Sequence, residues 1–195
     1  MKGQIQINTT CTLLAIATLL LIPCTRGYCT EEVLFERDLT GTSGFDFVYG
    51  SWEGNLRQTE EGIIIAEGCD NSGGAGFLHF LLNLADIPKE ELFAVVEAKR
   101  LPTSSARLLG VLLVSKAGSD ASCWQYPIKD ISMLDFETIY FPLAKSPVYT
   151  KDSGLDFSNV IELQLQGDYT HPGEIGLIVK KVKIIRRPVS LTTGE

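Results

Sequence analysis

Tryptophan and tyrosine are the side chains of this sequence best suited to hold a polyhydroxylated ligand. Their ring faces carry partial negative charge and stack on the apolar C–H faces of sugar rings. The candidates are Trp52, Trp124, Tyr49, Tyr126 and Tyr169. Trp124 is the best of them, because it follows the turn-forming residues 116–120 and alternates with Gln125 and Tyr126 along an expected strand. The alternative is that both tryptophans pack in the core or at its edge.

A row of amide and carboxylate side chains is the second candidate ligand surface. In residues 159–167 the apolar Ile161, Leu163 and Leu165 point to one face of a strand, with Val160 at the edge of the pattern. Glu162, Gln164 and Gln166 point to the other face. The glutamines could donate to and accept from sugar hydroxyls. The alternative is an outer sheet face that meets only water.

Two acidic residues near the start of the expected domain could hold a structural calcium ion. Calcium prefers several oxygen ligands from carboxylates and carbonyls. Glu36 and Asp38 are the nominated ligands, and simple solvated acids are the alternative. The sequence indicates no other cofactor.

Catalysis is not expected. The chain has two histidines, His79 and His171, and no GxSxG nucleophile turn. Asp130, Asp135 and Glu137 lie close in sequence, but no pattern singles out a pair of carboxylates for glycoside cleavage. A small polysaccharide-cleaving enzyme is therefore the least favoured of the functions considered.

Residues 1–27 are expected to be a cleaved signal peptide, which would place the mature protein outside the cell, in the periplasm or at the cell surface. Thr12–Ile22 is an uncharged apolar run of suitable length, and it is too short to span a membrane comfortably. Small residues precede a cleavage position before Tyr28. The alternatives are an uncleaved anchor and a lipid anchor at Cys24.

The net charge limits the classes of binding partner, and the cysteines limit the possible disulfides. The formal net charge is −7, and it falls to −9 without residues 1–27, which carry two basic and no acidic side chains. This argues against nucleic acid and anionic membranes as partners. Cys29, Cys69 and Cys123 remain after export. A Cys69–Cys123 disulfide is weakly preferred, and three unpaired thiols are the alternative.

About ten strand-like segments separated by turn signals predict an all-β fold, a two-sheet antiparallel β-sandwich. The centre of this prediction is a buried strand over residues 108–114, followed by a turn and a second strand. Residues 28–186 are expected to form one sandwich domain, and residues 187–195 a polar tail. In the last strand the alternation slips at Lys180–Lys181, which predicts a β-bulge.

The order of several short segments resembles the galactose-binding-like jelly roll, a class that includes carbohydrate-binding modules and the complex I intermediate-associated protein domain. The segments that carry the resemblance span most of residues 33–185: Phe35-Glu36, Gly73–Phe77, Val111–Val114, Trp124–Tyr126, Phe136–Thr138 with Pro142-Leu143, Leu155–Val160, Leu163–Gly167 and the isoleucine-rich strand over residues 175–185. The resemblance implies a secreted jelly roll that binds sugars on an open sheet face or at edge loops. It also implies a structural calcium near the chain ends.

The sequence therefore predicts a secreted, non-catalytic module that binds carbohydrate through Trp124, Tyr126, Trp52, Gln164, Gln166 and Tyr169. The main alternative is a structural, protein-interaction or assembly module of the cell envelope that binds no sugar.

Overall fold

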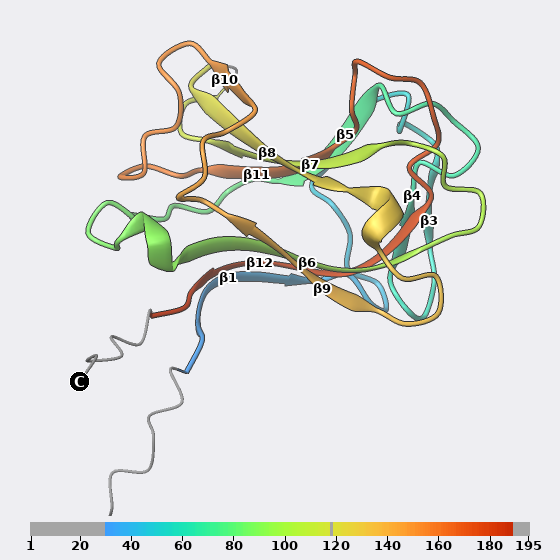
Figure 1. Cartoon of the computed structure of the whole chain (residues 1–195), viewed down its shortest axis with the longest axis horizontal. Helices are drawn as coiled ribbons and strands as arrows, with labels where there is room; N and C mark the ends of the chain where they lie inside the picture. The colour runs from blue at the N-terminus through green and yellow to red at the C-terminus, as the bar shows by residue number, and fades with distance from the viewer. Residues whose placement is uncertain (1–29, 118, 189–195) are drawn as a thin grey trace, which may run out of the picture.

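The computed structural model describes residues 30–117 and 119–188, and within them twelve strands form two six-stranded antiparallel sheets packed face to face (Figure 1). Sheet I contains β1 (Glu32–Asp38), β3 (Leu56–Gln58), β4 (Ile63–Ile65), β6 (Leu92–Arg100), β9 (Glu137–Pro142) and β12 (Leu177–Arg186). Sheet II contains β2 (Phe47–Gly50), β5 (Gly73–Phe77), β7 (Leu108–Val114), β8 (Ala121–Pro127), β10 (Tyr149–Lys151) and β11 (Glu162–Gln166). Two short 3-10 helices, η1 (Lys89–Glu91) and η2 (Ile128–Asp130), lie between strands. The predicted all-β, two-sheet sandwich is confirmed.

The core lies between the sheets and is filled by alternate residues of each central strand. Leu109, Val111 and Leu113 of β7 are fully buried, and so are Leu163 and Leu165 of β11. Burying one such side chain stabilises the fold by about 1.5–3 kcal/mol. The prediction that the leucines of β11 face the core is therefore confirmed.

The bulge predicted at Lys180–Lys181 is confirmed by a register shift between Val179 and Lys181 in the pairing of β12 with β6. Residues 177–179 of β12 pair with β4, and residues 181–186 pair with β1. The extra residue thus lets one long strand serve two different neighbours. Because β1 pairs with β12, the two ends of the described chain lie together (Figure 1).

The glycine-rich segment 69–76 contains most of a strand. Glycine is depleted in strands and residues 77–84 are largely apolar, so a loop followed by a strand would be the expectation from these patterns. Instead, strand β5 is Gly73–Phe77 and ends where the apolar run begins. Beyond it, Leu82 makes only an isolated bridge with Val160.

The glycines of β5 have a packing role. A Cβ atom at Gly74 would lie 2.5 Å from the Tyr49 hydroxyl oxygen, and one at Gly76 would lie 2.7 Å from Cζ of Phe47. The rings of Phe47 and Tyr49 in β2 therefore lie against a strand that has no side chains on that face. This close approach explains why a central strand carries glycine.

The predictions for the two ends of the chain fall outside the described residues. The expected signal peptide, Cys24, Cys29 and most of the polar tail lie in residues 1–29 and 189–195, outside the described part of the chain. Among residues 30–117 and 119–188, no helix has the length and hydrophobicity of a membrane span.

Candidate functional site

Both tryptophans lie in the core, which corrects the prediction that they form an accessible platform. Trp52 is fully buried and Trp124 is 5% exposed. The Trp124 Nε1–H donates to the carbonyl oxygen of Lys145 at 2.8 Å. Tyr126 is half-buried, and its ring meets Phe141 edge to face with centroids 6.1 Å apart.

The pairing register explains why these rings point inward. Val111 of β7 is opposite Trp124 of β8, and Val111 belongs to the core face. Directly opposed residues of an antiparallel pair point to the same face. Trp124 and Tyr126 therefore face sheet I, while Cys123 and Gln125 face away from it.

The outer face of sheet II collects the polar row predicted on β11. Gln164 is opposite Leu112 of β7, and Gln166 is opposite Gly110, which is itself opposite Gln125 of β8. The predicted glutamines thus share one face with the amide of Gln125, which the sequence reading did not include among the site residues.

A hollow of about 430 Å³ lies on this outer face. Two half-exposed tyrosines line it from different elements, Tyr149 of β10 (51% exposed) and Tyr169 of the loop after β11 (54% exposed). In Figure 1, β10 stands on the side of sheet II that faces away from sheet I. The remaining lining residues are Leu112, Ala121, Gln125, Lys151, Gln166, Gly167, Asp168 and Thr170.

A hydrogen-bonded chain fixes the polar row in place. The Tyr49 hydroxyl donates to Oε1 of Gln164 at 2.9 Å, and Nε2 of Gln164 donates to Oε1 of Glu162. Burial and the neighbouring Tyr169 hydroxyl raise the pKa of Tyr49, so its phenol stays a donor. Burial also raises the pKa of Glu162, partly offset by the Gln164 hydrogen bond. The orientation of the Gln164 amide is therefore set before any ligand arrives.

The Cys69–Cys123 disulfide is not formed, and both thiols are free. Cys123 faces outward under Gln166, whose Nε2 donates to its sulfur at 3.0 Å. Burial raises the pKa of Cys123 to about 11, so the thiol is protonated at neutral pH.

A buried aspartate holds the loop that carries Tyr169. Asp168 is 2% exposed and accepts from the backbone N–H of Thr170 at 3.0 Å, from the Thr170 hydroxyl and from Nδ1 of His171 at 3.1 Å. The other ring nitrogen of His171 lies 2.5 Å from Nη1 of Arg107, which can only donate, so Nδ1 carries the proton. Burial alone would raise the pKa of Asp168, but the hydrogen bonds from Thr170 and His171 together lower it.

Asp168→Ala is expected to lower the free energy of unfolding by about 2 kcal/mol, because it leaves three donors without their charged acceptor. The pKa of Asp168 is lower in the folded state. Its contribution is therefore present above the unfolded pKa and lost as pH falls through the folded value. Urea unfolding of both proteins at pH 7 and near pH 2.5 measures this.

Asp156→Ala is the matched control, because Asp156 makes the same pair of contacts with Ser158 on an exposed loop. Equal losses for the two variants at pH 7 would contradict the role given to Asp168.

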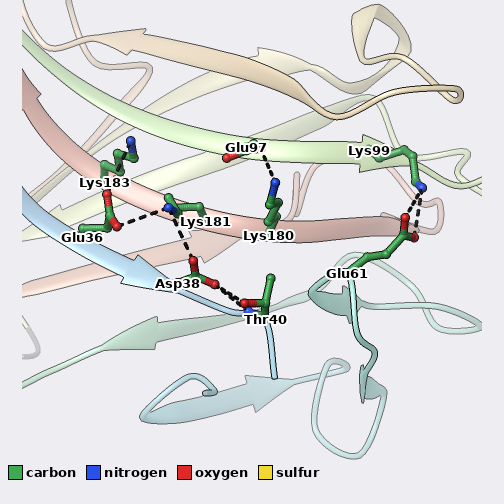
Figure 2. Close-up of polar contacts among 9 residues, drawn as sticks. All are labelled: Glu36, Asp38, Thr40, Glu61, Glu97, Lys99, Lys180, Lys181 and Lys183. Atoms are coloured by element: carbon green, nitrogen blue, oxygen red, sulfur yellow. Dashed lines mark hydrogen bonds and ion pairs between the residues drawn. The ribbon is translucent and has the colours of Figure 1, made fainter. Parts of the chain in front are cut away.

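The predicted calcium ligands lie on the outer face of sheet I and are already ion-paired (Figure 2). Glu36 lies 3.3 Å from Lys181 Nζ and 3.4 Å from Lys183 Nζ, and Asp38 lies 3.4 Å from Lys181 Nζ. In the described ranges, no group of three or more His, Cys, Asp or Glu side chains could hold a metal ion. A calcium ion at Glu36 and Asp38 would have to displace the Lys181 ammonium, so calcium stays a prediction and forms no part of the proposed site.

Tyr149, like Gln125, is a residue of this site that the sequence analysis did not predict. Residues 145–154 are mostly polar, which is typical of a loop, and strand β10 inside this segment has only three residues. Only the aromatic side chain of Tyr149 hinted at a role in binding. Its place in the site comes from the pairing of Tyr149 in β10 with Cys123 in β8, which the sequence of this segment does not show.

Comparison with known proteins identifies no family. No family model and no curated protein matches the chain. Among solved structures, the chain is similar to the crystal structure of an agarase, AgWH50C, with a TM-score of 0.47 and 11% sequence identity. The match covers 82% of this chain and 25% of the agarase chain. At that level it assigns neither a family nor an activity to this chain.

Proposed function

We propose that this protein is an exported, non-catalytic module that binds a neutral carbohydrate on the outer face of sheet II. One observation carries the proposal: the hollow of about 430 Å³ combines two half-exposed tyrosines with the amides of Gln125 and Gln166. Phenol rings stack on sugar C–H faces, and an amide both donates to and accepts from hydroxyl groups. Concave surfaces with a few fixed polar groups are typical of small-molecule sites.

The charges around the hollow favour a neutral ligand. Lys151 and Glu162 carry opposite charges and both line the outer face of sheet II. Asp168 also lines the hollow, and the Arg107 guanidinium, which contacts the same His171 ring that donates to Asp168, carries the opposite charge. A strongly charged ligand would meet a balanced surface and gain little electrostatic free energy.

Native gel electrophoresis through soluble neutral polysaccharides tests the proposal. Galactan, xylan, mixed-linkage β-glucan, galactomannan and low-melting agarose provide the panel. We expect at least one of them to retard the wild-type protein and to release no new reducing ends on incubation. No retardation across the panel and a broader glycan array would refute carbohydrate binding, and released reducing ends would refute the non-catalytic part.

A protein-interaction module is the second candidate, because two apolar side chains project from the loop between η2 and β9. Met133 is 51% exposed and Leu134 is 86% exposed. This candidate predicts a glycan-independent partner whose capture Leu134→Asp abolishes.

We also propose, from the sequence resemblance, that the sandwich is a galactose-binding-like jelly roll. The antiparallel sheets and the pairing of β1 with β12 are compatible with it. A crystal structure compared strand by strand with that class tests the assignment.

A further inference from the structure

A second hollow continues the first along sheet II. It has a volume of about 210 Å³ and is lined by Val114, Ser119, Glu162 and Gln164. The two hollows share the remaining lining residues, Leu112, Ala121 and Lys151. They are therefore adjoining parts of one groove.

The groove runs along β11. Gln166 lines the first hollow, while Gln164 and Glu162 line the second. From Glu162 to Gln166 the strand advances by four steps of about 3.3 Å, or about 13 Å, which exceeds the length of one pyranose ring. Leu112, opposite Gln164, lies between the two parts as an apolar floor.

Resting on the proposed function, we propose that Glu162 and Gln164 form a second sugar subsite, so that the groove holds at least two consecutive residues of a neutral oligosaccharide chain lying along β11. The tyrosine-lined hollow takes one residue by stacking. The second hollow takes the next by hydrogen bonding, because a carboxylate accepts strongly from hydroxyl groups.

Glu162 suits this role because its position is fixed. One of its oxygens accepts from Gln164, whose own oxygen is held by Tyr49, and a carboxylate has further lone pairs for a ligand. An acceptor oriented in advance loses less conformational entropy on binding.

A chain-length series on the full protein tests the second subsite. Oligosaccharides of one to six residues, prepared from the polysaccharide that retards the protein most, are titrated calorimetrically. We expect affinity to rise about tenfold or more between one and three residues. In Glu162→Gln, that gain is expected to fall below about threefold, with affinity for the monosaccharide unchanged.

Glu61→Gln is the matched control, because Glu61 pairs with Lys99 on sheet I (Figure 2) and should leave the whole series unchanged. Urea unfolding of the isosteric Glu162→Gln variant checks that its fold is intact. Since burial raises the pKa of Glu162, the gain with length should be lost as pH falls through a value above the ordinary 4.5, and only in proteins that keep Glu162.

The outcomes separate the two proposals. If affinity does not depend on length, or if Glu162→Gln weakens one-residue and three-residue ligands equally, the second subsite is refuted while carbohydrate binding stands. If no polysaccharide or oligosaccharide binds at all, the proposed function fails, and the subsite fails with it.

Discussion

Tyr169→Ala is expected to weaken carbohydrate binding about tenfold, and Tyr149→Ala combined with Tyr169→Ala about a hundredfold. Each ring offers a half-exposed face to the same hollow, and each stacking contact contributes about 1–1.5 kcal/mol. Both side chains are half-exposed, so their removal should change the free energy of unfolding little. Calorimetric titration with the retarding polysaccharide measures the loss.

Tyr140→Ala is the control for these variants. Tyr140 lies on sheet I, where its ring meets Phe93 edge to face with centroids 6.0 Å apart. It should bind carbohydrate as the wild type does. Wild-type affinity in the double tyrosine variant would show that the outer face of sheet II is not the site.

Trp124→Ala is expected to destabilise the protein by about 3–5 kcal/mol, because it opens a cavity in the core. It also breaks the hydrogen bond to the Lys145 carbonyl, which holds the segment leading into β10. Urea unfolding followed by far-ultraviolet circular dichroism measures the loss.

Trp124→Phe separates stability from binding. It keeps most of the buried apolar volume, and it should bind carbohydrate normally even where it is less stable. Loss of binding in a folded Trp124→Phe protein would support an indole contact with the ligand, contrary to the structure.

The two outer faces of the sandwich differ in chemistry. The outer face of sheet I is covered by ion pairs between strands (Figure 2). Glu36 pairs with Lys181 and Lys183, and Glu97 pairs with Lys180. Sheet II presents amides, tyrosines and glycines beside the charged side chains of Lys151 and Glu162. An ion-paired surface offers few groups to a neutral ligand, whereas amides and phenols offer both hydrogen bonds and stacking.

The strands with strong local patterns could be predicted from the sequence. The alternation of residues 161–166 gave the two faces of β11, and the break at Lys180–Lys181 marked the bulge in β12. In both places the signal lies within the strand itself, because burial of one face imposes a period of two.

The orientation of Trp124 could not be predicted in the same way. It depends on which residue of β7 stands opposite, and a shift of one residue would send the indole to the outer face. The roles of Tyr149 and of the β5 glycines also depend on residues of other strands. Tyr149 pairs with Cys123, and the glycines lie against Tyr49 and Phe47. Local sequence shows no such partner.

Amide chemical-shift mapping of the full protein with the retarding oligosaccharide tests the account most directly. We predict shifts concentrated at Gly110, Cys123, Gln125 and residues 166–170, with none at Val95, Thr138 or Lys183 on sheet I. Shifts confined to sheet I or to the loop at Leu134, with the outer face of sheet II unchanged, would contradict it.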